Sequence, residues 1–444
     1  MKNPVRAKKI TKPVNNNFFS DHGLYLPSFI LQPMKSIIAA SCIMMSLAAA
    51  AQTATPHGKR IYIPEDLRSM DLNCDTSQWS WRRSAQTNDL VFFWQKGFGH
   101  NLQDPPALDG KPMAVNLSVL MDRVQYFYTF FRDTLKFTKP GSKADEYKMM
   151  VMLNYSLDGT AYGGTYDNFI GALWVAPNRI QDTTMNCMAH ELGHSFQSQI
   201  MADSIGEAWG GAGFFEMASQ WMLWQVNPWW LRDENYHLEA FKTLTHKAFL
   251  AMENIYHSPY VIQWWSDLHG RESIAELFRQ GKIGEDPVDT YKRMYGMTQK
   301  EFCEEMLRGY QHLVDFDFKH AQKETRPYAC QWDTPLDTLA GKWMQPKFLP
   351  EDYGVNFIPL NPDKHRKVRV KGTDVMYSLV GVTENGQRVY GGVNSGSLPS
   401  YNGKLKKLFL VVMGAPKQHS HLQMPGEEAT ETPNRTYTYK FKVI

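Results

Sequence analysis

The 444-residue sequence predicts an α+β protein built from a mixed domain of helices and a small sheet over residues 76–338 and an all-β sandwich over residues 339–444. Three observations predict this class. Helical periods of three and four residues dominate residues 115–316, with short apolar strands near their start. Beyond about residue 340, alternating strands and turns such as Asn385-Gly386 replace the helical periods. Finally, one of the expected helices carries the polar motif His190-Glu191-Leu192-Gly193-His194.

The first 51 residues indicate a targeting segment. Met34-Lys35-Ser36 precedes a short apolar run and the small residues 48–51, which is the pattern of a secretory signal cut near Ala51. The run is too short to favour a membrane span. We therefore expect a spurious N-terminal extension (1–33), a signal peptide (34–51) and an irregular lead-in (52–75). The mature chain is expected to be secreted, periplasmic or held at the cell surface, without a membrane span.

Composition and cysteine content exclude several classes. With 48 basic and 45 acidic residues, the formal net charge of +3 is too balanced to indicate a nucleic acid or an anionic membrane as partner. Secretion permits disulfides, but the spacing of the remaining cysteines selects no pairing. None belongs to a CxxC metal pair, and the four are Cys74, Cys187, Cys303 and Cys330.

Within the mixed domain, strands are expected first and helices afterwards. Apolar runs bounded by Gly or Pro predict strands, and glycines 159, 163 and 164 are interpreted as a loop between two of them. The expected strands are 89–94, 148–154 and 170–175, and the expected helices are 115–137, 185–201, 214–225, 260–269 and 273–278. A glycine-rich loop over 207–213 separates the second and third helices.

The C-terminal part is expected to be a β-sandwich of about 100 residues. It binds carbohydrate or a partner surface, or it simply packs on the mixed domain, and Tyr390 and Tyr401 do not decide between these alternatives. Its expected strands are 355–360, 366–370, 375–382, 408–412 and 436–443.

The motif at residues 190–194 points to a metal site. On a helix, positions i and i+4 share one face, so His190 and His194 can direct both imidazoles at one ion. Glu191 stands beside them, placed to act on a water that zinc acidifies. With 14 His in the chain, such a motif arises by chance in roughly two chains per hundred. The amphipathic helix, the secretory signal and the strand just upstream reduce that risk.

A catalytic zinc ion needs a third protein ligand. The metzincin pattern requires Gly at position 197 and His at 200, where this chain has Gln197 and Ile200. Glu216 fits a glutamate ligand on a second helix, because a buried acid among apolar residues needs a partner. Two alternatives stay open: Glu216 is only an acid at a helix start, or Glu207 in the loop is the ligand.

The motif together with Glu216 resembles the gluzincin, thermolysin-like zinc peptidases. The resemblance implies a zincin-like catalytic domain, Zn²⁺ held by His190, His194 and Glu216, and Glu191 as general base. It also implies that residues 170–175 form an edge strand that pairs with the substrate backbone. Thermolysin-like enzymes place an aspartate four residues after the ligand glutamate. This chain has Gln220 there, which can accept the same hydrogen bond without the charge.

Residues 88–315 with the following β-domain resemble, more specifically, a family of secreted bacterial proteins known mainly as a domain of unknown function. The matching segments are Val91-Phe92-Phe93-Trp94 with Gly97-Phe98-Gly99, the HELGHSFQ segment and the run at 260–270.

The sequence predicts a secreted zinc metallopeptidase that hydrolyses peptide bonds in a protein or glycoprotein. The alternatives are a zinc hydrolase of glycans or glycopeptides, and a non-catalytic carbohydrate- or protein-binding protein on the same scaffold. An oxyanion donor is also needed. Tyr256 and His257 form the best candidate cluster, and Tyr260, Tyr236, His237 and His246 are the other candidates.

Overall fold

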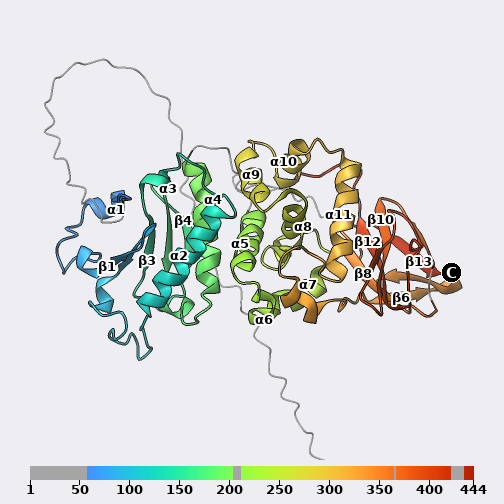
Figure 1. Ribbon diagram of the computed structural model, residues 1–444, viewed down its shortest axis with the longest axis horizontal. Coiled ribbons are helices and arrows are strands. Elements are labelled where there is room, and N and C mark those ends of the chain that lie inside the picture. The colour runs from blue at the N-terminus through green and yellow to red at the C-terminus, as the bar shows by residue number, and fades with distance from the viewer. Residues whose placement is uncertain (1–57, 204–211, 365–366, 422–434) are drawn as a thin grey trace, which may run out of the picture. The chain divides into compact units, whose positions relative to one another are not determined.

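The computed structural model describes residues 58–203, 212–364, 367–421 and 435–444, and residues 52–444 form one compact unit. The expected extension and signal peptide (1–51) and the rival ligand Glu207 lie outside the described residues. The architecture is α+β, with helices and three small sheets (Figure 1). The predicted α+β class is therefore confirmed.

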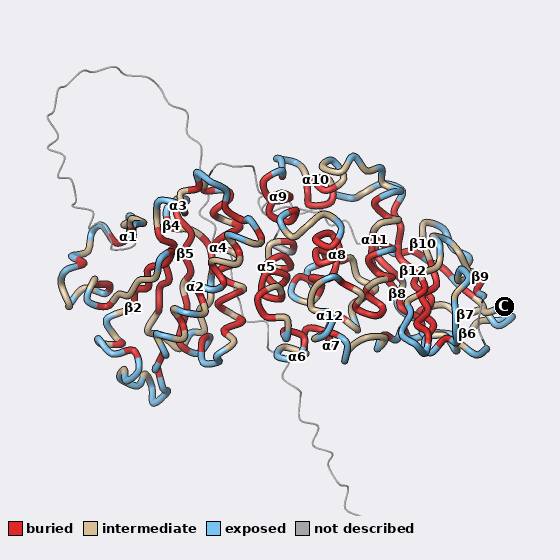
Figure 2. The backbone as a smooth tube through the Cα atoms, viewed as in Figure 1, coloured by how far each residue is buried: buried red, intermediate tan, exposed pale blue. Residues whose placement is uncertain are grey.

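The first sheet has five strands in the order β1-β2-β3-β5-β4. The three central strands are parallel, and β1 and β4 pair antiparallel at the two edges. The central strands read as almost unbroken apolar runs and are buried along nearly their whole length (Figure 2), as expected for parallel strands. The bounds are β1 Ser84–Gln86, β2 Leu90–Trp94, β3 Met149–Leu153, β4 Ala161–Tyr166 and β5 Ile170–Val175.

Strand β4 overturns two predictions. The segment around Gly163 and Gly164 is a strand and not a loop, and β4 rather than β5 (residues 170–175) is the edge of the sheet. The glycines belong to the strand because helix α4 (Asn186–Ala202) packs directly on it. A Cβ at position 163 would lie 1.8 Å from the carbonyl oxygen of Glu191. A glycine inside a strand can therefore mark a close approach of backbone instead of a turn.

Gly163→Ala is expected to lower the free energy of unfolding by about 3 kcal/mol, because the added methyl group meets rigid helix backbone. Urea unfolding of the purified variant measures the change. Gly392→Ala is the matched control, since residue 392 is exposed and a Cβ there meets only Ser395 at 3.7 Å. Equal stability of the two variants would contradict the close packing of β4 on α4.

The helices follow the predicted periods closely. Asn116 caps α2 by accepting from Val119 N–H, and Thr298 forms a capping box with Glu301 at the start of α11. No helix of the described residues has the length and apolarity to cross a bilayer. The longer helices are α2 Leu117–Asp133, α4, α5 Ala212–Val226, α7 Asn235–Leu244, α8 Tyr260–His269, α9 Glu272–Gln280, α10 Pro287–Met294 and α11 Gln299–Val314. The short ones are α1 Glu65–Arg68, α3 Lys143–Glu146, α6 Trp230–Asp233 and α12 Gln322–Thr325.

The C-terminal part contains two antiparallel four-stranded sheets, in the orders β11-β10-β12-β8 and β6-β7-β13-β9. Apolar side chains from both sheets, among them Leu410 and Phe441, form one shared core. The bounds are β6 Leu336–Leu339, β7 Trp343–Pro346, β8 Val355–Leu360, β9 Val368–Gly372, β10 Val375–Thr383, β11 Arg388–Tyr390, β12 Leu405–Gly414 and β13 Tyr439–Val443.

The other face of the β11-β10-β12-β8 sheet packs against α11, and the main apolar core continues from the helices into this sheet. Buried hydrogen bonds join the two: Tyr310 Oη donates to Tyr353 O at 2.7 Å, and Gln311 Nε2 donates to Ser378 Oγ at 2.7 Å. The core is thus continuous across the boundary expected at residue 338, and that boundary stays a prediction.

The four cysteines of the described residues are free thiols, so none of the permitted disulfides is formed among them. Burial raises the pKa values of the Cys187, Cys303 and Cys330 thiols to about 12. These three side chains therefore behave as packed, unreactive groups.

Candidate metal centre

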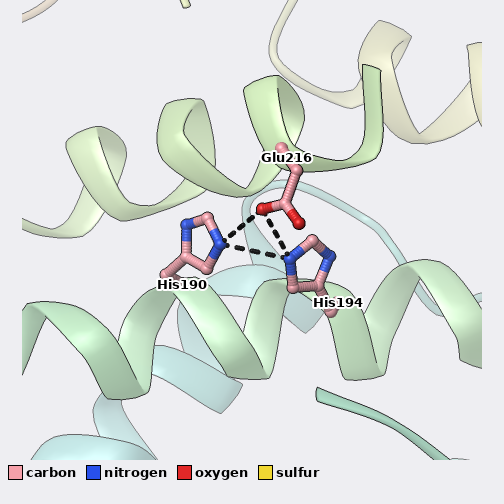
Figure 3. A group of neighbouring side chains, drawn as sticks. All are labelled: His190, His194 and Glu216. Atoms are coloured by element: carbon pink, nitrogen blue, oxygen red, sulfur yellow. Dashed lines mark hydrogen bonds and ion pairs between the residues drawn. The ribbon is translucent and has the colours of Figure 1, made fainter. Parts of the chain in front are cut away.

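Helices α4 and α5 bring three ligand-type side chains together. The helices approach closely at Gly193, where a Cβ would lie 2.9 Å from Ser219 Oγ of α5. His190 and His194 project from α4 and Glu216 from α5, and the three converge on one point (Figure 3). The close helix contact thus places the expected ligand set in one cluster.

The three donor atoms form a nearly regular triangle. His190 Nε2 lies 2.9 Å from Glu216 Oε2, His194 Nε2 lies 3.2 Å from the same oxygen, and the two nitrogens are 3.1 Å apart. Zinc binds nitrogen and oxygen ligands at about 2.0–2.2 Å in tetrahedral geometry, which separates two ligand atoms by about 3.3 Å. A small outward movement of each side chain would accommodate one ion.

The charges in this cluster are strongly coupled. Burial alone would lower the pKa of His194, but the hydrogen bond to Glu216 and its charge outweigh burial and raise that pKa to about 9. Burial alone would raise the pKa of Glu216, yet hydrogen bonds from His190 and His194 hold it well below its usual range. The carboxylate is therefore ionised and already in contact with both imidazoles, as a metal ligand must be.

A second layer of amides orients both imidazoles. Gln220 Oε1 lies 3.0 Å from His190 Nδ1, and Gln197 Oε1 lies 3.0 Å from His194 Nδ1. The Gln220 amide is fixed in this orientation because its Nε2 donates to Tyr256 O at 3.1 Å. Each amide oxygen accepts the Nδ1 proton and so directs Nε2 at the cluster. The role expected for Gln220 is observed. The contact of Gln197 with His194 was not predicted, although an i+3 spacing on a helix brings two side chains close together.

Gln220→Ala is expected to weaken zinc binding by about 10- to 100-fold, because His190 loses the acceptor that fixes its ring. Competition of the purified protein with a chromogenic chelator measures the affinity. The matched control is Gln225→Ala on the same helix, whose amide contacts Gln263 and not the cluster. Unchanged affinity in the Gln220 variant would show that the amide does not support the site.

Glu191 is a buried carboxylate beside the cluster. The residue is 9% exposed, and its side chain forms no hydrogen bond or ion pair with the described residues. Its charge acts on His194 and on Tyr256. A carboxylate that is buried without a partner is costly in a purely structural role. Its position next to His190 on α4 leaves it free to exchange protons with a molecule bound at the cluster.

The structure separates the two candidate oxyanion donors. The Tyr256 hydroxyl donates a hydrogen bond to Glu216, its ring centroid lies 6.0 Å from that of His190, and burial with the Glu216 charge raises its pKa. His257 instead lies with Nδ1 at 2.8 Å from His237 Nδ1 and makes no hydrogen bond to the ligand cluster. Tyr256 can therefore act at the cluster directly, and His257 reaches it only through other residues.

The other candidate oxyanion donors do not contact the ligand cluster. Tyr260 is buried among aromatic side chains, and His246 stacks on Phe348. His237 belongs to a polar chain behind the site, because its Nε2 lies 3.2 Å from Gln220 Nε2 and 3.5 Å from Glu234 Oε2.

Glu234, the last residue of this series of polar contacts, was not identified from the sequence. Burial alone would raise its pKa, but hydrogen bonds from His237 and Trp230 outweigh burial and lower it. Burial, followed by the charge of His237, lowers the pKa of the adjoining His257 to about 4, so that imidazole is neutral near neutral pH. The i, i+3 spacing of Glu234 and His237 could have indicated from the sequence that their side chains lie close together.

Comparison with known proteins gives a family without an assigned activity. The family described as "Family of unknown function (DUF6055)" matches residues 53–444. No curated protein matches the chain. Two solved structures of functionally unknown conserved proteins from Bacillus anthracis str. Ames show a weak likeness. One, a mutant, is 12% identical over 73% of each chain with a TM-score of 0.33. The other is 11% identical over 76% of this chain and 75% of that chain, with a TM-score of 0.28.

Proposed function

We propose, for a chain that belongs to the family of unknown function DUF6055, the activity of a zinc-dependent metallopeptidase with a zincin-like catalytic domain. The observation that carries the proposal is the convergence of His190 Nε2, His194 Nε2 and Glu216 Oε2 beside a buried Glu191 that has no ion pair among the described residues. Residues 34–51 add the expectation that the activity is exported.

The donor set fits zinc. Two imidazoles and one carboxylate are the protein ligands of a common type of catalytic zinc site, which keeps a further position open. Each imidazole has an amide acceptor on its far nitrogen, as zinc-binding histidines usually do. A zinc ion held by these residues would supply a Lewis acid that acidifies water and polarises a substrate carbonyl.

The side chains around the triad provide the remaining chemistry. Glu191 accepts the proton of the attacking water and passes it to the leaving amine. Tyr256 is 40% exposed, and its hydroxyl, which is hydrogen-bonded to Glu216, donates to the negative charge that develops on the substrate carbonyl oxygen. His257 has no direct part in these steps, since it contacts His237.

The free edge of β4 favours an extended peptide as substrate. Among the described strands β4 pairs only with β5, and it packs on α4 beside Glu191. A peptide that adds to this edge as a further strand would run past the ligand cluster, and main-chain hydrogen bonds would hold it. Ala161–Tyr166 thus takes the part that the resemblance assigned to residues 170–175.

Chelation tests the proposal. The purified protein is expected to contain about one zinc ion per chain and to cleave members of a panel of peptides and mucin-type glycoproteins. Treatment with 1,10-phenanthroline should abolish cleavage, and added Zn²⁺ should restore it. Cleavage that survives full removal of metal would refute the proposal. Loss of glycoprotein cleavage after enzymatic deglycosylation, with peptides left intact, would instead favour hydrolysis of glycopeptides.

A further inference from the structure

The outer face of the β6-β7-β13-β9 sheet is strongly basic. Along β13, Tyr439 and Phe441 point into the core shared by the two sheets, so the intervening Lys440 and Lys442 point outward. In β9, Val368 and Val370 pack on the same core, and Arg369 and Lys371 are exposed. Two neighbouring strands thus present four cations on one face of the sheet.

These cations stand directly opposite one another. The strand register pairs Lys440 with Lys371 and Lys442 with Arg369. The ammonium groups of Lys371, Lys440 and Lys442 all gather around one indole ring, at 5.3, 5.3 and 5.2 Å from the centroid of Trp343 on β7. Like charges in opposite positions of a sheet destabilise it, and the described residues provide no ion pair for any of the four.

Positive charge is concentrated in this part of the chain. Residues 336–444 contain 15 Lys and Arg against 9 Asp and Glu, whereas the whole chain has 48 against 45. The rest of the protein is therefore slightly acidic. An anionic ligand would be steered to the C-terminal sheets and repelled elsewhere.

We propose that this basic face, formed by Trp343, Arg369, Lys371, Lys440 and Lys442, binds an acidic polysaccharide. Cations recur at about 5 Å across the strands and about 7 Å along them, so a linear chain of acidic sugars can contact several at once. Cation–π contacts with the half-buried indole of Trp343 hold three of the ammonium groups in place on this face. The bound anions would relieve the repulsion between the opposed lysines.

The shape of the basic face disfavours other anions. A membrane-binding surface inserts apolar side chains into the lipid, whereas Trp343 lies beneath three ammonium groups. A single-stranded nucleic acid needs several aromatic rings for successive bases, and Trp343 is the sole aromatic side chain on the outward positions of the described strands β6, β7, β9 and β13. A polymer of acidic sugars needs neither an inserted apolar side chain nor a series of rings, and it can contact the paired cations of β9 and β13.

Binding to chondroitin sulfate, measured by isothermal titration calorimetry with EDTA present, tests the inference independently of the zinc site. The full chain is expected to bind at low ionic strength and to release the polymer as salt is raised. Lys440→Gln/Lys442→Gln should weaken binding by about tenfold. It should not lower the melting temperature, because it removes like-charge contacts.

Lys406→Gln/Lys407→Gln is the matched control, since it removes the same charge from exposed positions of β12 in the other sheet. It should stay within about twofold of the unmodified protein. The inference fails if chondroitin sulfate does not bind, or if the control loses as much affinity as the β13 variant. It also fails if phosphatidylserine vesicles or DNA bind more tightly than the polysaccharide.

Discussion

Glu191→Gln is expected to reduce peptide hydrolysis by about a thousandfold while zinc stays bound. A positioned general base contributes about 10²- to 10⁴-fold to a rate. The amide has nearly the same size as the carboxylate but cannot accept a proton. Because Glu191 is buried without an ion pair in the described residues, the substitution breaks no structural contact. The loss should therefore appear in kcat, with little change in the stability of the protein.

Three measurements separate this outcome from unfolding or metal loss. Zinc content, urea unfolding and the rate of cleavage of the best peptide are compared with those of the unmodified chain. Glu239→Gln is the matched control, because Glu239 is an exposed acid on α7 whose one ion pair within the described residues is with Lys242. The control should keep full activity. A Glu191 variant as active as the control would remove this residue from the mechanism.

Elements with a complete apolar run or helical period were the ones that the sequence predicted best. The helix expected at 260–269 and the strand expected at 355–360 have the observed bounds, and the helix expected at 185–201 is shifted by one residue. In each of these, the apolar period and the flanking breakers are local properties of the chain. The short strands β1, β6, β7 and β11 were missed because three or four half-exposed residues give no period.

The strand β4 shows a different limit. Gly163 and Gly164 were interpreted as part of a loop because glycine most often interrupts helices and strands. The need for glycine at position 163 comes from the carbonyl of Glu191, which is 28 residues further along the chain. This contact arises only when the helix packs on the sheet. The residues around Gly163 in the sequence therefore give no sign of it.

The site divides in the same way. The spacing of His190 and His194 is a local helix property, and Glu216 was inferred as an acid in an apolar helix. By contrast, the contacts that link Gln220 to His237 and His237 to Glu234 depend on how α5 packs against the start of α7. No motif marks those residues. His257 was expected beside the ligand cluster, but it contacts His237 in this network, and its catalytic role stays a prediction.

Glu216→Ala is expected to weaken zinc binding by more than the roughly 100-fold typical of outer-layer substitutions, because a direct ligand is lost. Two imidazoles on one helix then hold the ion alone. In metal-free protein the substitution should also lower the pKa of His194, which the Glu216 carboxylate holds at about 9. Metal analysis after dialysis and NMR titration of the histidine ring protons measure the two effects.

Glu207→Ala provides the decisive comparison, since Glu207 is the rival ligand that the sequence offers and lies outside the described residues. If Glu216 completes the site, the Glu207 variant keeps its zinc, and the Glu216 variant loses both zinc and cleavage. The opposite result would show that Glu207, and not Glu216, completes the site. The contact of Glu216 Oε2 with both imidazoles, at 2.9 and 3.2 Å, argues for the first outcome. Adding Zn²⁺ in excess to the Glu216 variant should restore part of the cleavage, because the base Glu191 is intact.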